Sequence, residues 1–434
     1  MHQVVIIGGG FGGLCAVRAL RRSAVQVTLV DRRNYHLFQP LLYQIATGAL
    51  SPANIAAPLR SLLRRQANAQ VLLGEVVDFD LPGRRVVLRD GELKYDTLIV
   101  AAGATHSYFG HPEWEPLAPG LKTIEDATSI RRRILRAFES AERLSAPELN
   151  HPREDITACL TFVIVGGGPT GVEMAGAISE LAHDTLRKEF RAIDPTTARI
   201  LLVEAGERVL PPFAQDLSTS ARTALEQLKV EVRSGTLVVG IEPGAVLLKR
   251  GDQTERIATH TVIWSAGVAA SPLAKLLAEK TGAELDRGGR VSVLPDLTVP
   301  GHPEVIVIGD MAHCPGADGK PLPGLAPVAM QQGDYAARLI GARLALSNST
   351  GGQLPAFRYR DRGTMATIGT MKAVCDIFGW RYSGILAWLT WLFVHLMQIV
   401  QFENRLLVLI QWAGHYITRN RSARLITGND EEKM

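Results

Sequence analysis

The sequence has few cysteines, and no two of them are closely spaced. Cys15, Cys159, Cys314 and Cys375 are the only four among 434 residues, and no two stand close enough for a CxxC motif. Disulfide frameworks and structural zinc sites need closely spaced cysteines. We therefore expect reduced thiols and no metal site.

The chain also lacks a long apolar run at its N-terminus and an excess of one charge. The apolar run at residues 4–7 is only four residues long, which does not fit a secretion signal. Basic residues number 47 and acidic residues 43, so the net charge of +4 gives no general case for nucleic acid. We expect a cytosolic protein with two or three folded units, because 434 residues exceed the usual size of one core.

Glycine is abundant, with 41 residues, and one glycine cluster follows the apolar run at residues 4–7. Gly8, Gly10 and Gly13 form a GxGxxG turn that leads into a helical pattern, and the next predicted strand ends at Asp31. Such a turn binds the pyrophosphate of a dinucleotide at a helix N-terminus, and the acid binds its ribose. The pattern predicts a first dinucleotide site.

The same series occurs a second time. Another apolar strand runs into Gly166, Gly168 and Gly171, a helical pattern follows, and the next strand ends at Glu204. A carboxylate there accepts hydrogen bonds from a free 2′-hydroxyl and repels a 2′-phosphate, so NADH is expected rather than NADPH. Arg208 either weakens this preference or pairs locally.

A late strand decides which dinucleotide binds where. Residues 305–308 form an apolar strand that leads into Gly309 and Asp310. In flavoproteins with two dinucleotide folds, a carboxylate in this place lies beside the ribityl chain of the flavin. The alternative is an ordinary acid that caps a helix. We assign FAD to the first site and NADH to the second.

These patterns predict an α/β fold with two Rossmann-like dinucleotide-binding domains, the second inserted in the first, and C-terminal amphipathic helices that associate with a membrane. The predicted FAD-binding domain spans residues 1–112 and 291–350. The NADH-binding domain spans 113–290, and the membrane-anchoring region spans 356–434.

Four stretches of the chain resemble the type II NADH:quinone oxidoreductases, flavoproteins related to the pyridine nucleotide-disulfide oxidoreductases. They are residues 5–13, 31–43, 168–173 and 308–310. The Asn-Tyr-His-Leu-Phe and Gly-Pro-Thr-Gly-Val-Glu sequences within them are more specific than the glycines alone. The resemblance implies hydride transfer from NADH to FAD, then two-electron reduction of a membrane quinone, without proton pumping.

The resemblance also implies a quinone pocket lined by an Ala-Gln-x-Ala-x-Gln helix. Residues 326–331 read Ala-Pro-Val-Ala-Met-Gln here, so Pro327 replaces the first glutamine of that motif. The replacement removes a hydrogen-bonding side chain from the pocket. Ala329, Met330 and Gln331 carry over as expected quinone contacts, and Gln331 as a catalytic residue.

Glu173 is the second expected catalytic residue. It stands two residues beyond the last glycine of the second turn, and the resemblance places it near the flavin and nicotinamide, where it would relay a proton. The alternative is a carboxylate that stabilises the positive end of its helix. The remaining expected contacts are Phe11, Gly12, Arg32, Val77, Ala102, Gly103 and Ala329 for FAD, and Pro169, Thr170 and Gly267 for NADH.

Two apolar stretches close the sequence, at residues 385–400 and 406–417. The first is shorter than the roughly 20 residues that span a bilayer. We expect residues 383–424 to form two helices in the membrane surface, on the cytoplasmic side, with indoles at headgroup depth. The nearby Arg419, Arg421 and Arg424 would then face anionic lipid. The alternatives are a homodimer interface, ordinary core helices or one spanning helix, and a homodimer is compatible with membrane attachment.

Three other classes of flavoprotein compete with this interpretation. Disulfide reductases need a Cys-x4-Cys pair soon after the first turn, and residues 37–48 contain no cysteine. Sulfide:quinone oxidoreductases need a reactive cysteine pair, for which Cys159 and Cys375 are the only candidates. A redox sensor without turnover is the third alternative. The complete second turn with Glu204 favours NADH as the electron donor.

Overall fold

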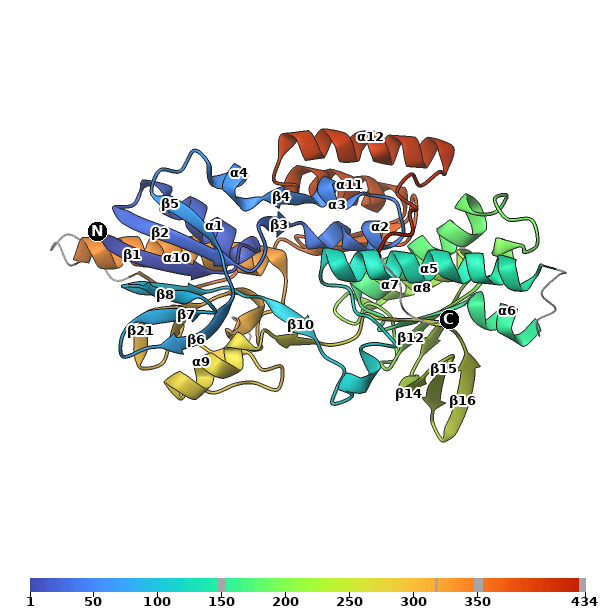
Figure 1. The fold of residues 1–434 in the computed structure, drawn as a ribbon, viewed down its shortest axis with the longest axis horizontal. Helices are drawn as coiled ribbons and strands as arrows, with labels where there is room; N and C mark the ends of the chain where they lie inside the picture. The colour runs from blue at the N-terminus through green and yellow to red at the C-terminus, as the bar shows by residue number, and fades with distance from the viewer. Residues whose placement is uncertain (147–152, 317–318, 347–353, 429–434) are drawn as a thin grey trace. The chain divides into compact units, whose positions relative to one another are not determined.

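The computed structural model describes residues 1–146, 153–316, 319–346 and 354–428, which form two compact units (Figure 1). Unit 1 comprises Met1–Leu37, Ala56–Thr105 and Val268–Asp361, and unit 2 comprises Phe38–Ile55, His106–Gly267 and Arg362–Met434. Each unit is therefore assembled from three separate stretches of chain. The predicted domain boundary at residue 350 lies outside the described residues.

Unit 1 is built on a six-stranded sheet with the strand order β20-β21-β9-β1-β2-β5. All neighbours are parallel except β20 and β21. The strand β1 is buried from Val4 to Ile7, as expected for a parallel sheet covered on both faces. The strands are β20 (Thr298–Val299), β21 (His302–Val307), β9 (Thr97–Val100), β1 (His2–Ile7), β2 (Val25–Asp31) and β5 (Ala69–Leu73).

Two helices of unit 1, α1 (Phe11–Ala19) and α10 (Ala326–Leu346), pack against each other. Their backbones approach closely, because a Cβ atom on Gly333 would lie 2.3 Å from the carbonyl oxygen of Gly12. The other elements of this unit are η1 (Leu20–Arg22), β3 (Tyr35–Leu37), β4 (Ala56–Pro58), α4 (Leu59–Leu63), β6 (Val76–Asp80), β7 (Arg85–Leu88), β8 (Gly91–Lys94), α9 (Leu273–Thr281), β19 (Val291–Ser292), η6 (Gly309–Met311) and β22 (Ala312–His313). The strands β10 (Ala104–His106) and β18 (Val268–Ala270) lie where the chain passes between the units.

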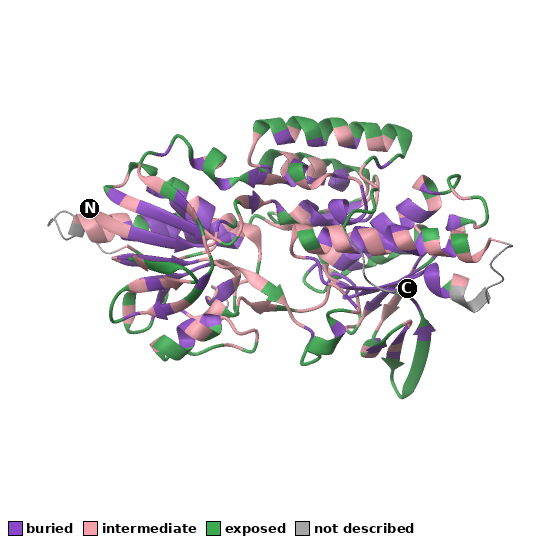
Figure 2. Cartoon of the chain, viewed as in Figure 1, coloured by how far each residue is buried: buried purple, intermediate pink, exposed green. Residues whose placement is uncertain are grey.

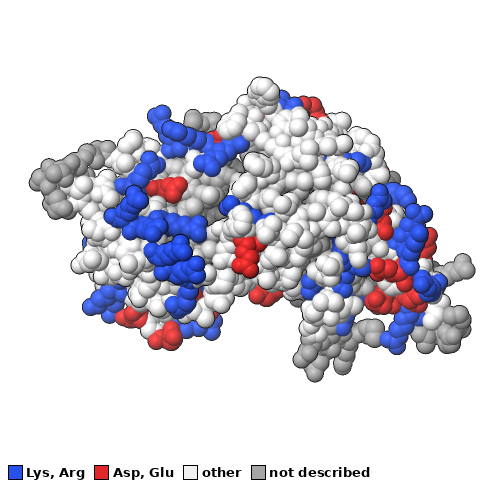
Figure 3. Space-filling model, turned by 90° about the horizontal axis from the view of Figure 1, so that it is seen from above, with Lys and Arg blue, Asp and Glu red and all other residues white. Residues whose placement is uncertain are grey.

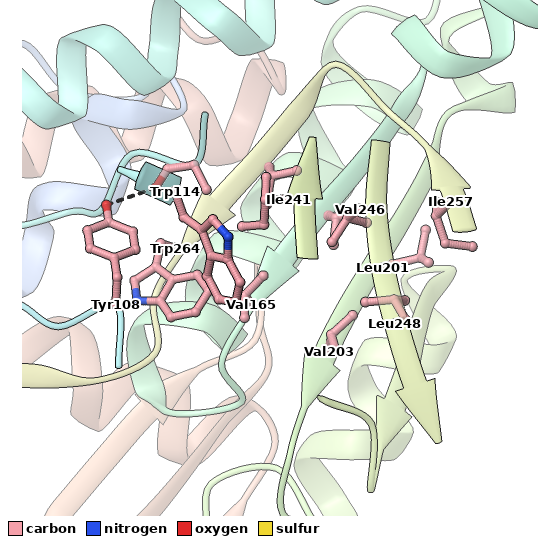
Figure 4. Packing of buried hydrophobic residues seen from close by; sticks show 13 residues of the cluster. Tyr108, Trp114, Val165, Leu201, Val203, Ile241, Val246, Leu248, Ile257 and Trp264 are labelled. Carbon is pink, nitrogen blue, oxygen red and sulfur yellow. Dashed lines mark hydrogen bonds between the residues drawn. The ribbon is translucent and has the colours of Figure 1, made fainter. Parts of the chain in front are cut away.

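Unit 2 contains a second parallel sheet, with the order β13-β12-β11-β17, and an antiparallel meander, β14-β15-β16. Buried aliphatic residues from both meet Tyr108, Trp114 and Trp264 in one core cluster (Figure 4). The Trp264 indole donates to the Ser107 carbonyl at 2.9 Å, so its polar atom is satisfied. The strands are β11 (Thr161–Val165), β12 (Arg199–Glu204), β13 (Val230–Ser234), β14 (Leu237–Glu242), β15 (Ala245–Arg250), β16 (Gln253–Ala258) and β17 (Thr261–Trp264).

The helices of unit 2 include the one that follows the second glycine turn, α7 (Pro169–Glu180). The others that precede the C-terminal region are η2 (Gln39–Leu41), α2 (Leu42–Ala46), α3 (Pro52–Ile55), η3 (Pro112–Trp114), α5 (Ile124–Leu144), α6 (Arg153–Cys159), η4 (Leu181–Thr185), η5 (Pro195–Thr197) and α8 (Gln215–Gln227). These elements confirm the predicted α/β fold with two dinucleotide-type sheets.

The C-terminal region of unit 2 consists of three antiparallel strands, β23 (Thr364–Thr367), β24 (Ala373–Ile377) and β25 (Trp380–Ser383), and the helices α11 (Ile385–Gln398) and α12 (Phe402–Thr418). The expectation that the indoles lie at headgroup depth is wrong. Trp388, Trp391 and Trp412 are at most 7% exposed, because they pack into the unit.

The outward side of these two helices is aliphatic and aromatic instead. On the exposed surface lie Ile385, Leu386, Leu389, Phe393, Met397, Phe402, Leu406, Leu407, Leu409, Ile410 and Ile417 (Figure 2). Among the described residues no helix combines the length and the apolarity that crossing a bilayer requires.

Candidate active site

The first glycine turn, in unit 1, has a geometry that only glycine permits at two positions. Gly8 has a φ of +101°, and a Cβ on it would lie 2.4 Å from the Ala101 carbonyl oxygen. A Cβ on Gly13 would lie 1.8 Å from the carbonyl oxygen of Gly8. Gly10, by contrast, faces open space with nothing within 4 Å. The turn therefore leaves room for a ligand at its middle glycine.

Two side chains brace this turn. Asp31 accepts hydrogen bonds from the backbone N–H groups of Gly9 at 2.6 Å and Arg33 at 2.7 Å. Burial nevertheless raises the pKa of Asp31, and the two hydrogen bonds act in the opposite direction. The buried imidazole of His36 donates from Nδ1 to the Gly9 carbonyl at 2.9 Å. His36 was not among the site residues predicted from the sequence, although it lies within the specific Asn-Tyr-His-Leu-Phe stretch.

The second turn, in unit 2, repeats this arrangement. Gly166 has a φ of +106°, and a Cβ on Gly171 would lie 1.8 Å from the Gly166 carbonyl oxygen. Glu204 accepts from the backbone N–H of Gly167 at 2.6 Å, as Asp31 does from Gly9. Gly168 again faces open space. The two turns are thus equivalent in geometry.

The helices behind both turns begin without a capping side chain. The N-cap residues of α1 and α7 are Gly10 and Gly168, and neither helix has an acidic residue in its first turn. The helix α5, in contrast, has a complete capping box at Thr123. The N–H groups at the starts of α1 and α7 have no side-chain cap, and a pyrophosphate requires such donors, so both turns fit a dinucleotide.

The other residues predicted to contact FAD or NADH differ in conformation and exposure. Gly103 and Gly267 both have positive φ, +70° and +69°, at the ends of equivalent strands. Arg208 donates to the Pro211 carbonyl at 2.8 Å, which is the local pairing that the sequence left as one alternative. Val77 is exposed on β6. Ala102 is half-buried and lies next to Gly103 in the sequence, and Arg32 is exposed after β2. The helix α1 begins with Phe11 and Gly12, and α7 begins with Pro169 and Thr170.

Asp310 follows β21 in unit 1 and is half-buried. The backbone at Gly324 lies over its carboxylate, because a Cβ there would lie 3.2 Å from Asp310 Oδ1. The neighbouring Gly309 donates its N–H at 2.6 Å to the side chain of Gln332, which is 1% exposed. Gln332 was also missed, because it lies one residue beyond the stretch compared with the quinone motif.

The predicted quinone contacts lie on α10. Ala329 is buried, and its carbonyl oxygen faces Gly12 of α1. Met330 and Gln331 are half-buried. The Gln331 amide donates to the Arg360 carbonyl at 2.9 Å and accepts from the Arg360 N–H at 3.0 Å. Both ends of this amide are therefore occupied by backbone of the same unit.

Glu173 lies on one face of α7 in unit 2. Its carboxylate accepts the backbone N–H of Thr367, but burial dominates and raises its pKa from 4.5 to about 8. Gly176 and Glu180 continue the same face, three and seven residues further on. A Cβ on Gly176 would lie 2.9 Å from the Gly369 nitrogen, and Glu180 accepts from the Thr370 N–H. The loop between β23 and β24 therefore rests on this face.

A buried hydrogen-bonded chain links α12 to the neighbourhood of Glu173. The Trp412 indole donates to Gln44 Oε1 at 2.7 Å, and Gln44 Nε2 donates to the Tyr43 hydroxyl at 3.0 Å. Burial raises the pKa of Tyr43, and the Glu173 carboxylate is the next cause. Tyr43 is the last residue of the family-like stretch at residues 31–43, and Gln44 lies one residue beyond it. Only their positions in the fold reveal that they belong to this hydrogen-bonded chain.

The three arginines expected to face lipid, Arg419, Arg421 and Arg424, are paired with carboxylates, and for the buried Arg421 the expectation is wrong. They form ion pairs with Asp184, Glu180 and Glu189, respectively. Only 2% of the Arg421 side chain is exposed, and it also donates to the Thr47 carbonyl at 3.2 Å. These pairs fasten the segment after α12 onto unit 2, since a buried guanidinium needs a carboxylate partner.

None of the four cysteines forms a disulfide in the structure. Cys159 and Cys375 are both buried, and burial raises the pKa of Cys375 to about 11. Among the described residues, no cluster of three or more His, Cys, Asp or Glu side chains is arranged to hold a metal ion.

Comparison with known families agrees with this arrangement. The pyridine nucleotide-disulphide oxidoreductase profile matches residues 2–333, and the NDH2 C-terminal domain profile matches residues 362–420. A type II NADH:quinone oxidoreductase, Ndh of Mycobacterium tuberculosis, is 46% identical over 98% of this chain and 90% of its own length. A second protein of that organism, NdhA, is 45% identical over 98% of this chain and 89% of its own length.

Solved structures share the fold. The NDH2 of Plasmodium falciparum in complex with NADH aligns with a TM-score of 0.86 and 20% identity over 98% of this chain and 100% of that chain. A sulfide:quinone oxidoreductase from Aquifex aeolicus aligns with a TM-score of 0.71 and 16% identity, over 91% of this chain and 90% of that chain. The profiles and the identity to the mycobacterial proteins confirm the resemblance found in the sequence, and the chain belongs to the family of type II NADH:quinone oxidoreductases.

Proposed function

We propose that this protein oxidises NADH and reduces a membrane quinone with FAD as its resident cofactor, and that it pumps no protons. The observation that carries the proposal is the pair of equivalent glycine turns, each with free helix N–H groups and a bracing carboxylate, in a chain of this family. One turn suits a resident dinucleotide and the other a dinucleotide substrate.

FAD is assigned to unit 1 and NADH to unit 2. The pyrophosphate of FAD would bind at Gly10, with Asp31 at the ribose and Asp310 at the ribityl chain. NADH would bind at Gly168, where Glu204 favours a free 2′-hydroxyl. The other proposed FAD contacts are Gly8, Phe11, Gly12, Gly13, Arg32, Val77, Ala102, Gly103 and Ala329, and the other NADH contacts are Gly166, Pro169, Thr170, Gly171 and Gly267.

The predicted domains remain our proposal for how these sites are divided along the chain. Residues 1–112 and 291–350 would bind FAD, and residues 113–290 would bind NADH. The compact units differ from this division in detail, because Val268–Asp361 belongs to unit 1 and Phe38–Ile55 to unit 2. Ligand binding and packing need not divide a chain at the same residues.

Bound FAD supplies the hydride acceptor and the two electrons for the quinone. Glu173 supports this chemistry as a proton donor, since a carboxyl group with a pKa of about 8 holds its proton at neutral pH. Ala329, Met330 and Gln331 are the proposed quinone contacts. Gln331 Nε2 donates one of its two hydrogens to the Arg360 carbonyl, so the second hydrogen is the one that would bind the quinone.

Residues 383–424 are proposed to hold the protein on the cytoplasmic face of the cell membrane as a peripheral protein. The exposed aliphatic side of α11 and α12 supports this, because a soluble surface rarely carries so continuous an apolar area. A homodimer that buries part of the same surface is the competing use.

Rapid mixing tests the reaction. We expect NADH to bleach the bound flavin much faster than NADPH, and ubiquinone or menaquinone analogues to reoxidise it. Bleaching without reoxidation by any quinone would instead support a redox sensor. Bleaching by sulfide but not by NADH would favour a sulfide:quinone oxidoreductase and would refute the proposal.

A further inference from the structure

Unit 1 carries a patch of five exposed arginines on α4 and η1 and the residues next to them. They are Arg21, Arg22, Arg60, Arg64 and Arg65, and we call them the unit 1 arginine patch. Among the described residues, none of the five forms an ion pair with a carboxylate. Figure 3 shows basic side chains gathered over this part of the unit.

The local charge around the patch differs from that of the whole chain. Residues 11–70 contain eight arginines, no lysine and one acidic residue, Asp31, so they carry +7 in a chain whose net charge is only +4. The Asp31 carboxylate is already occupied by the backbone N–H groups of Gly9 and Arg33. The patch is therefore not neutralised from within its own segment.

Two polar side chains, the buried Gln66 and the half-buried Asn68, hold the two parts of the patch together. Gln66 donates to the Val17 carbonyl at 2.7 Å, and Asn68 donates to the Leu20 carbonyl at 3.0 Å. The guanidinium of Arg21 in turn donates to the Arg65 carbonyl at 3.4 Å. These bonds bring the arginines of η1 and those of α4 onto one surface, where like charges repel each other.

We propose that the unit 1 arginine patch binds the surface of a membrane that contains anionic phospholipid. Guanidinium groups bind phosphate oxygens through two parallel hydrogen bonds, and a cluster of cations is attracted to the negative leaflet. The choice of lipid as partner rests on the proposed reaction with a membrane quinone. Single-stranded nucleic acid fits less well, because it needs aromatic side chains for stacking and residues 12–34 and 56–70 contain none.

Vesicle co-sedimentation of the full-length holoenzyme tests this assignment. The variant is Arg60→Glu/Arg64→Glu/Arg65→Glu, and the vesicles contain phosphatidylcholine with or without phosphatidylglycerol. We expect the variant to lose about tenfold or more of its partition into the anionic vesicles at low salt, and little into neutral ones. Added salt should abolish the difference between wild type and variant.

A matched control separates this patch from net charge. Lys249→Glu/Arg250→Glu/Arg287→Glu changes the charge equally at exposed positions elsewhere, and it should bind anionic vesicles as the wild type does. Equal loss in the control, or unchanged binding of the patch variant, would overturn the proposal. So would competition by duplex DNA stronger than that by the anionic vesicles.

The proposed reaction is measured separately in the same preparations. NADH oxidation with a water-soluble quinone analogue should be equal in wild type and patch variant, which also verifies that the variant is folded. If the wild type lacks this activity the proposed function fails, and the vesicle assay still decides whether the patch binds lipid.

Discussion

The two dinucleotide turns are nearly identical in geometry, but different structures cover the helices that follow them. The critical Cβ distances at Gly13 and Gly171 are both 1.8 Å, and Asp31 and Glu204 each accept a backbone N–H at 2.6 Å. The helix α1 is covered by another helix, α10. The helix α7 is covered by the loop between β23 and β24, which two carboxylates hold.

This difference shows where site chemistry arises in such a fold. Small residues make close packing possible on both helices, through Gly12 on α1 and Gly176 on α7. The helix α7 presents two carboxyl groups to the structure that covers it, whereas α1 presents the thiol of Cys15 to α10. The turn thus has the shape that a dinucleotide requires, and the cover of the helix determines which titratable side chains lie beside it.

The largest expected effects come from adding one methyl group to either turn. Gly13→Ala should yield protein without bound flavin, because the new Cβ overlaps the Gly8 carbonyl oxygen. Gly171→Ala should keep the flavin but lose its bleaching by NADH. Flavin absorbance after purification and rapid mixing with NADH measure the two losses.

Gly10→Ala and Gly168→Ala are the controls, because both positions face open space. These variants should unfold at the same denaturant concentration as the wild type and bind their dinucleotides more weakly. Equal effects of the two alanine variants on flavin content would mean that the turns do not serve different dinucleotides.

Breaking the buried ion pair between Arg421 and Glu180 should lower the stability of the protein, which is a smaller effect than the loss of a dinucleotide. Arg421→Met leaves the Glu180 carboxylate without its cation, and we expect a loss of about 3–5 kcal/mol in the free energy of unfolding. Glu180→Leu/Arg421→Leu should recover much of this loss. Denaturant titrations measure both, and a double variant as unstable as the single one would contradict the account.

Glu173 should make stability depend on pH. Its pKa rises from 4.5 to about 8 on folding, so unfolding releases a proton between these values. The stabilisation is complete below pH 4.5 and is lost as pH rises through 8, by at most about 5 kcal/mol. Glu173→Gln should remove this slope from the denaturation midpoint measured across the same range.

The reaction offers a second measurement at Glu173. If the protonated carboxyl group serves the quinone, kcat of the wild type should fall above pH 8, and Glu173→Gln should be slow at every pH. Equal pH profiles of kcat in the two proteins would assign Glu173 a purely structural role on α7.

The smallest expected effect concerns the hydrogen-bonded chain that runs from Trp412 on α12 to Tyr43. Trp412→Phe leaves Gln44 Oε1 without a donor and should cost about 1–2 kcal/mol beyond the loss of ring volume. Trp391→Phe is the matched control, because its indole N–H has no partner among the described residues. Unfolding free energies that fall equally in both variants would show that the hydrogen bond contributes nothing.

Local patterns were enough to predict both turns, their bracing acids and the strands around them. The apolar strand expected directly before Gly166 is β11 (Thr161–Val165), which ends at the residue before that glycine. A buried parallel strand needs a continuous apolar run, and a tight turn needs glycine, so both leave a mark in a few adjacent residues. The helices expected at residues 385–400 and 406–417 were found because each of these stretches is also a local apolar run.

The orientation of those two helices could not be predicted in the same way. Trp391 and Trp412 turn inwards and the aliphatic residues turn outwards, because the face of α12 that carries Trp412 meets Gln44, far away in the sequence. The partner of Arg421, Glu180, is also far away in the sequence. The contact of Gln332 with Gly309 lies outside any motif.

The sequence by itself determined the family, through four short stretches, and the two dinucleotide turns, since each turn and its acid lie within about 40 positions of one another. Only the tertiary structure decided which carboxyl group is buried enough to hold a proton at neutral pH and which arginines are paired. Burial and ion pairing arise from segments that meet in space, and no local pattern records which segments will meet.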